Sequence, residues 1–124
     1  MKVSPNPEAL SDPMHSDCPG RDVFKLVTGR WTLLILWALR SGPMRFHRIR
    51  DTVEGISERV LSSTLKELGR NGLIDRHVEP SVPPRVSYSL TQCGEGLLDV
   101  MDRLTNWIAS ELAYIENAKK NYRG

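Results

Sequence analysis

The sequence predicts a mainly α-helical chain with one small β-hairpin, an α+β fold. Apolar residues recur at helical spacing over most of the chain, whereas residues 73–78 and 86–90 alternate apolar and polar residues as half-buried strands do. Pro80, Pro83 and Pro84 stiffen the loop between these two runs and cannot donate to a sheet ladder. A stiff hairpin directly after an amphipathic helix is typical of a winged helix-turn-helix and indicates DNA binding.

Length and composition suit one domain with a modest core. The chain has 124 residues, of which 40% are hydrophobic and 26% are charged. Its longest apolar run, Leu33 to Leu39, is far shorter than the roughly 20 residues that span a bilayer, so no membrane partner is expected. Two cysteines, Cys18 and Cys93, do not form a disulfide framework, and no secretion signal is evident. We therefore expect a cytoplasmic protein.

Positive charge is concentrated in the middle of the chain. Residues 18–90 hold 12 Lys and Arg against 7 acids, whereas residues 1–17 have a net charge of −2 and residues 91–124 a net charge of −1. Arginine dominates this basic segment, and guanidinium groups suit phosphates and base edges. A solvated helix face with acidic partners would explain some of these residues, but not the excess.

The order of the elements divides the chain into three parts. Residues 1–17, polar and rich in proline, are predicted to form a flexible N-terminal arm. Residues 18–91 are predicted to form the winged helix-turn-helix domain, with a helix to about Thr28, a buried helix over 30–40 and a short strand near 44–46. Residues 92–124 are predicted to form one long C-terminal dimerisation helix, capped by Thr91.

A short helix from His47 to Thr52 or Val53, a turn around Gly55 and a helix over 57–71 form the predicted helix-turn-helix. Ser57 is a good N-cap for the second helix, and Asn71-Gly72 supplies its left-handed stop. The second helix should lie in the major groove. Its predicted buried stripe consists of Val60, Leu61, Thr64, Leu65 and Leu68, and in the short helix before the turn Ile49 and Val53 are predicted to face inward.

The face of this helix opposite the buried stripe carries the candidate DNA contacts. Arginine and lysine suit guanine O6 and N7, and serine suits either a base edge or a phosphate. A generic amphipathic helix also exposes such residues, but here a wing that carries a cation follows directly. The predicted DNA-binding residues are Ser57, Arg59, Ser62, Ser63, Lys66 and, on the wing, Arg85.

The last helix carries an apolar stripe longer than one small domain can cover. All of its members except Trp107 recur at steps of three and four residues, and Trp107 widens the stripe. A second copy of the chain is expected to bury these residues. A helix that folds back on its own core is the alternative, and it would bury part of the stripe. The predicted dimer interface consists of Leu97, Met101, Leu104, Trp107, Ile108, Leu112 and Ile115.

A series of short motifs runs from Cys18 to Gly94, about three fifths of the chain. The motifs are Cys18-Pro19, residues 29–36 (Gly-Arg-Trp-Thr-Leu-Leu-Ile-Leu), Gly42-Pro43, Arg45-Phe46, Gly55-Ile56-Ser57, Arg59, Leu61-Ser62, residues 65–68, residues 72–74, and the very specific run Val82-Pro83-Pro84-Arg85-Val86-x-Tyr88. With these motifs the sequence resembles the HxlR-type family of bacterial winged helix-turn-helix regulators. The resemblance implies a dimeric transcription factor whose recognition helix is residues 57–71.

Cys18 is the candidate redox sensor. It precedes a proline in a first helical turn, where free backbone N–H groups favour the thiolate. In the resembled family a cysteine at this place often senses electrophiles or oxidants, which implies that role here. A half-buried structural thiol is the alternative. Cys93 shares the electrostatic argument but not the family match, so we expect an ordinary surface residue.

These observations predict a homodimeric transcription factor, a repressor on a pseudo-palindromic operator of double-stranded DNA. The three histidines are dispersed, and no catalytic constellation is visible, so we expect no metal, no cofactor and no enzyme activity. The inducer would be an electrophile or a small ligand. Two alternatives stay open: a winged-helix module for protein–protein contact, and a regulator that holds a small ligand near Trp31, Trp37 and Trp107 with Cys18 silent.

Overall fold

The computed structural model describes residues 20–124 and has the predicted winged helix-turn-helix fold. Its helices are α2 (Gly20–Val27), α3 (Arg30–Ala38), the 3₁₀ turn η1 (Leu39–Ser41), α4 (Phe46–Thr52), α5 (Glu58–Arg70) and α6 (Gln92–Asn121). Its strands are β1 (Met44–Arg45), β2 (Ile74–Glu79) and β3 (Arg85–Leu90), in the order β1-β3-β2, with both pairings antiparallel. The predicted arm, residues 1–17, lies outside the described residues.

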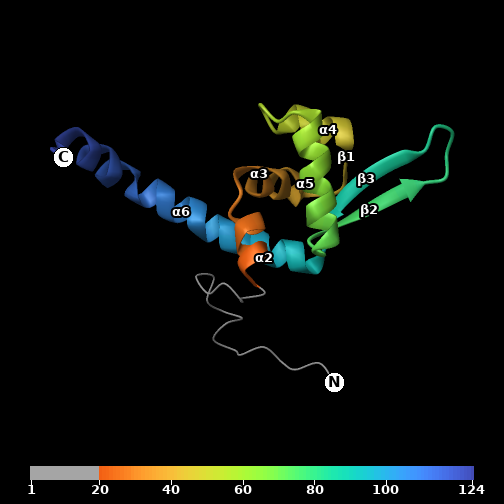
Figure 1. The fold of residues 1–124 in the computed structure, drawn as a ribbon, viewed down its shortest axis with the longest axis horizontal. Helices are drawn as coiled ribbons and strands as arrows, with labels where there is room; N and C mark the ends of the chain where they lie inside the picture. The colour runs from red at the N-terminus through yellow and green to blue at the C-terminus, as the bar shows by residue number, and fades with distance from the viewer. Residues whose placement is uncertain (1–19) are drawn as a thin grey trace, which may run out of the picture.

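The hydrophobic core lies where α3, α4 and α5 meet the base of the sheet and the first turns of α6 (Figure 1). Ile35, Leu36 and Leu39 are fully buried at its centre. From α4 and α5, the core receives the predicted inward residues, including Ile49 and Leu61. This core fixes the helix-turn-helix against the sheet, so the remaining elements can project from it.

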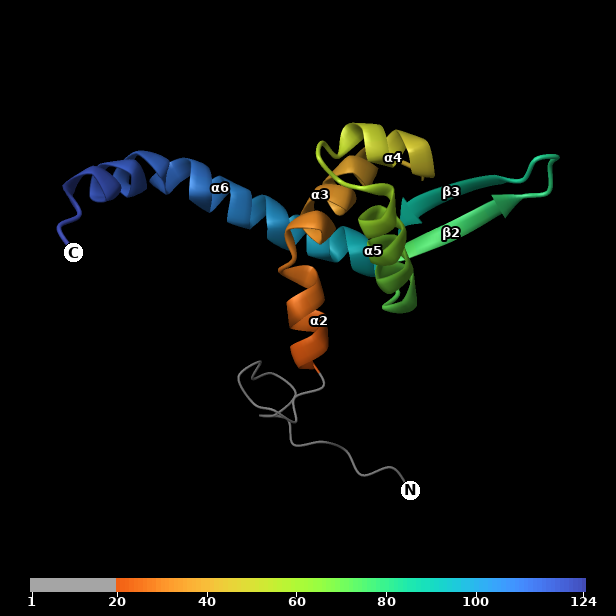
Figure 2. The ribbon, with the colours of Figure 1, turned by 45° about the horizontal axis from the view of Figure 1, so that its top comes forward.

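Two segments extend from this body toward opposite sides. The β2–β3 hairpin leaves on one side, and the C-terminal half of α6 leaves on the other (Figures 1 and 2). Most side chains of both segments are therefore exposed in the single chain.

Local signals placed most helix boundaries correctly. The Ser57 side chain accepts a hydrogen bond from the Val60 N–H at 3.1 Å, and Thr91 caps α6 in the same way through Gly94, at 3.0 Å. Gly72, at φ +74°, ends α5 as predicted. At the base of α6, a Cβ on Gly94 would lie 2.1 Å from the Leu73 carbonyl oxygen, so α6 packs this close only because the residue is glycine.

Two expectations about burial were wrong. Leu34 and Trp37 of α3 are 42% and 40% exposed, because no other described part of the chain covers their side of the helix. On β2, only Ile74 is buried, so this strand is not half-buried along its length. The reason is that the hairpin extends beyond the body. Smaller differences are that α3 passes into a 3₁₀ turn after Ala38, and that α4 begins at Phe46.

Candidate nucleic-acid interface

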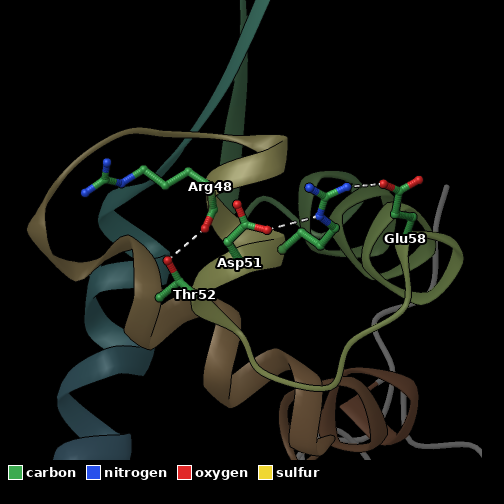
Figure 3. A network of polar contacts seen from close by, with 5 residues as sticks. Arg48, Asp51, Thr52 and Glu58 are labelled. Carbon is green, nitrogen blue, oxygen red and sulfur yellow. Dashed lines mark hydrogen bonds and ion pairs between the residues drawn. The ribbon is translucent and has the colours of Figure 1, made fainter.

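Two sets of contacts hold the helix-turn-helix: apolar packing beneath its turn and an ion-pair network on its surface. Ile49, Val53 and Ile56 are buried beneath the turn between α4 and α5. On the surface, the Arg50 guanidinium donates to Asp51 of its own helix, at 3.3 Å, and to Glu58 in the first turn of α5 (Figure 3). The network therefore ties the end of α4 to the start of the recognition helix.

The same carboxylates limit what Arg50 can offer to another partner. The hydrogen bonds that Arg50 donates to Glu58 and then to Asp51 raise the pKa of Arg50 above its ordinary value, so its charge is permanent but already partnered. Arg48, by contrast, points away from the network into solvent (Figure 3). No ion pair to Arg48 occurs within residues 20–124.

Every DNA-contact residue predicted on α5 and at its cap is exposed, but the residues do not form a single group. Successive residues of a helix are turned by about 100°, so Ser62 and Ser63 point to different sides. Ser62 lines a cleft toward the wing together with Lys66. Ser63 lines a hollow on the opposite side, toward α2 and α3. Arg59 and Lys66 are seven residues apart, or about two helical turns, so they lie on one line along the outer surface of α5, between these two sides. This line is called the crest of α5.

The wing has two faces that its strand register identifies. Arg85 pairs with Glu79 at the outer end of the hairpin, on the same face as the hydrogen bond of 2.9 Å between His77 Nε2 and Ser89 Oγ. Ile74, which is buried, lies on the other face. Arg85, predicted as a DNA contact, is exposed, but it is turned away from the face that meets the body, and a carboxylate is its direct cross-strand neighbour.

The predicted dimer stripe divides between the core and solvent. Met101 is buried and Leu97 is half-buried in the chain's own core, as the alternative of a folded-back helix requires. Ile115 is also half-buried. The other members are exposed by 44% to 57%, and with Leu34 and Trp37 of α3 they define an apolar surface. The α3–α6 apolar surface consists of Leu34, Trp37, Val100, Leu104, Trp107, Ile108 and Leu112.

An apolar groove of about 700 Å³ lies at the α3 end of this surface. Leu33, Leu34 and Trp37 line it from α3, and Met101 and Thr105 line it from α6. Sequence reasoning missed the contribution of α3, because a helix that is apolar all round was expected to be wholly inside. The length of α3 could have predicted this exposure, because the nine residues of the helix cannot all face a core this small.

Only one of the two cysteines lies in the described part of the chain. Cys93 is exposed in the first turn of α6, as expected of a surface residue. Cys18, the candidate sensor, lies outside the described residues. Across residues 20–124, no helix combines the length and hydropathy needed to cross a membrane.

The family model for the HxlR-like helix-turn-helix matches residues 26–116. The chain belongs to the HxlR family. As a member, it is a transcriptional regulator of the helix-turn-helix type and not an enzyme. The matched range runs from the end of α2 through the helix-turn-helix and wing into α6, so it covers both the candidate DNA surface and most of the α3–α6 apolar surface.

Relatives in the HxlR family support this assignment. The HTH-type transcriptional regulator YtfH of Escherichia coli is 44% identical over 95 residues, which are 77% of this chain and 75% of YtfH. The structure of the transcriptional regulator YtfH from Salmonella typhimurium matches with a TM-score of 0.76 at 41% identity, over 84% of this chain and 93% of that one.

A relative with redox-related structures is YodB of Bacillus subtilis. Diamide-treated YodB matches with a TM-score of 0.66 at 37% identity, over 77% of this chain and 96% of that one. YodB has also been solved in a reduced form. As a regulator, YodB is 38% identical to this chain over 91 residues, which are 73% of this chain and 81% of YodB.

Proposed function

We propose that this HxlR-family protein is a homodimeric, sequence-specific DNA-binding repressor that occupies a pseudo-palindromic operator. The observation that carries the proposal is the outer face of α5, where Arg59 and Lys66 follow one crest and are exposed. No ion pair to either side chain occurs in the described part of the chain. These two cations are therefore free to meet guanine edges in the major groove.

The helix-turn-helix network supports a division of labour between bases and backbone. Because Asp51 and Glu58 hold Arg50, that guanidinium sets the angle between α4 and α5 more than it contacts DNA. Arg48, which points into solvent, is available for a phosphate (Figure 3). Such phosphate contacts give most of the affinity, whereas the crest of α5 and Ser62 give the sequence preference.

A second copy of the chain is the proposed cover for the α3–α6 apolar surface. Large contiguous apolar patches on soluble proteins usually mark an interface. Here the patch extends along α6 from the groove at Trp37 to Leu112, well beyond the chain's own core. Symmetric pairing of the two α6 helices would place two recognition helices in successive major grooves, about 34 Å apart.

Selection of bound duplexes from a random pool tests the DNA-binding proposal. The expected product is an inverted repeat with half-sites one helical turn apart. On that operator, Arg59→Ala and Lys66→Ala should each weaken specific binding by about 1–3 kcal/mol while the fold is retained. Lys120→Ala, a change in an exposed cation of the last turn of α6, is the matched control and should leave affinity unchanged. Unchanged affinity in both α5 variants would remove this helix as the element that recognises bases.

We further propose that Cys18 makes the repressor responsive to electrophiles or oxidants. Support comes from the Cys18-Pro19 motif and from relatives solved in two redox states: YodB, diamide-treated and reduced, and the redox regulator HypR, which is 29% identical in its reduced form. An adduct on the thiolate, or a disulfide between subunits formed by an added oxidant, would alter the spacing of the recognition helices.

The two cysteines offer a matched pair for testing this response. Cys18→Ser should bind the operator normally and lose its response to diamide or a quinone, whereas Cys93→Ser should respond as wild type does. If wild-type protein holds its operator unchanged after full thiol modification, Cys18 is structural.

A further inference from the structure

A basic cleft of about 380 Å³ separates the recognition helix from the wing. Helix α5 contributes one wall, with Ser62, Lys66, Gly69 and Arg70, and the sheet contributes Arg76 and Tyr88. Neither Arg70 nor Arg76 is among the DNA contacts predicted from the sequence. Below, this space is called the helix–wing cleft.

The strand register determines which wing cation faces this cleft. Side chains alternate between the two faces of a strand, and directly paired residues of antiparallel strands share a face. Arg76 pairs with Tyr88, and it lies two residues from the buried Ile74, so these three side chains are on the face toward α5. Arg85 pairs with Glu79 on the opposite face, at the far end of the hairpin. The two wing arginines therefore cannot serve the same site.

The charges of the helix–wing cleft are unbalanced. Three cations line it, Lys66, Arg70 and Arg76, and the described residues contribute no carboxylate to its lining. Glu67 holds the Arg70 guanidinium at 2.9 Å, and this hydrogen bond raises the pKa of Arg70. No ion pair to Lys66 or Arg76 occurs between Gly20 and Gly124. A cleft with this excess of positive charge suits an extended anion that contacts several of the cations at once.

The backbone of the cleft also permits close approach. Gly69 exposes the α5 backbone toward this space, and a Cβ placed there would meet nothing within 4 Å. The hydroxyl groups of Ser62 and Tyr88 add neutral donors on the two walls. Lys66 and Ser62 also border the face of α5 that is proposed to meet the bases, whereas the Arg70 and Arg76 guanidinium groups and the Tyr88 hydroxyl remain as donors for phosphate oxygens on the two facing walls.

We propose that the helix–wing cleft holds the phosphodiester backbone of the DNA strand that separates the two grooves, and that Arg76, not Arg85, is the wing's principal phosphate contact. This inference rests on the proposed DNA-binding function. When α5 enters the major groove and the wing crosses toward the adjacent minor groove, the strand between the grooves must pass between these two elements. The helix–wing cleft lies between them, and Arg76 lines it from the wing side.

Salt dependence gives the first test, with Arg85→Ala as the matched control. Because a phosphate contact releases a counterion, Arg76→Ala should lower the slope of log affinity against log NaCl by about one, and should weaken operator and random DNA by a similar factor of about ten. Arg76→Lys should keep the slope, and Arg85→Ala should change affinity less than about twofold by the same reasoning. A loss of slope in Arg85→Ala with none in Arg76→Ala would overturn the assignment.

Neutral linkages in the operator give the second test. Single methylphosphonate substitutions are placed along each strand, and the positions that weaken wild-type binding are found. At the phosphate held by the cleft, the methylphosphonate should weaken operator binding by wild type and by Arg85→Ala equally. It should not weaken binding by Arg76→Ala any further, because the methylphosphonate and the loss of Arg76 remove the same contact. If the losses of affinity from Arg76→Ala and from the methylphosphonate add fully at every position, the inference is contradicted.

Two outcomes tell a failure of this inference from a failure of the proposed function. If wild type shows no preference for any selected duplex over random DNA, the proposed function itself fails. If wild type binds specifically and Arg76→Ala binds as wild type does, this inference alone is overturned.

Discussion

The two projections of this molecule differ in chemistry although both leave the same small body. On one side, α5 exposes Arg59, and Lys66 and Arg76 line a cleft whose described lining has no carboxylate. On the other side, α6 exposes Trp107 and its apolar neighbours, and α3 continues that surface. Neither surface is buried by the described chain, so each is available to a partner, and its side chains indicate which kind.

Under the proposed function, this contrast separates DNA recognition from assembly within one short chain. Exposed charged side chains stay hydrated until a phosphate replaces their water, so their exposure on the wing side carries no penalty in the free chain. Exposed tryptophan and leucine side chains have no such compensation, and association is their route to burial. Changes to the two sides should therefore produce different failures: loss of the dimer on the apolar side and loss of DNA binding on the basic side.

The largest effect is expected at Trp107, which is 57% exposed and lies midway along the length of the α6 stripe. In Trp107→Asp, each subunit loses an aromatic contact of about 2 kcal/mol and gains a charge, so the dimer should weaken by about 4 kcal/mol, roughly a thousandfold. Analytical ultracentrifugation would measure this as a monomer at micromolar concentration. Val82→Asp replaces a fully exposed valine on the wing loop and should leave the dimer intact. Equal dissociation in both variants would mean that the comparison between the two sides is wrong.

A second effect sharpens the comparison where the start of α6 packs against the segment between α5 and β2. Gly94→Ala places a methyl group against the Leu73 carbonyl oxygen and strains the hydrogen bond of 3.1 Å from the Thr91 N–H to that oxygen. The variant should lose about 2 kcal/mol of unfolding free energy in a urea titration. Gly96→Ala, two residues on, meets nothing within 4 Å, and it should gain about 0.5–1 kcal/mol. A stabilised Gly94→Ala would show that α6 is not packed at Leu73.

A smaller effect is expected at the start of the recognition helix. Ser57→Ala removes the acceptor for the Val60 N–H and should cost about 1 kcal/mol of stability. Because the cap orders the first turn of α5, operator affinity should fall more than random-DNA affinity. Ser57→Asp restores an acceptor and should recover the stability but not the affinity, because it adds a negative charge beside the DNA. Thermal melts and binding titrations on the three proteins would separate the two roles.

Sequence reasoning succeeded where the physics is local. Caps at Ser57 and Thr91 and the stop at Gly72 depend on hydrogen bonds and dihedral angles within a few residues, so their residue types alone predicted them. The inward residues of α4 and α5 followed from helical periodicity for the same reason.

The sequence could not predict properties that depend on how elements pack. Exposure of Trp37 depends on which side of α3 the rest of the chain covers, and periodicity carries no such information when every side is apolar. The opposite orientations of Arg76 and Arg85 depend on strand register, which a slip of one residue would reverse. The outward course of the hairpin, which exposes β2 beyond Ile74, is likewise a tertiary feature.

The central claim is that the apolar side fixes the distance between two copies of the DNA-binding side. The most direct test inserts base pairs between the half-sites of the selected operator and measures wild-type affinity. Five inserted base pairs, about half a turn, place the half-sites on opposite sides of the duplex, so affinity should fall to that of a single half-site or of random DNA. Undiminished affinity after this insertion would contradict the account, because it would mean that each recognition helix binds independently of its partner.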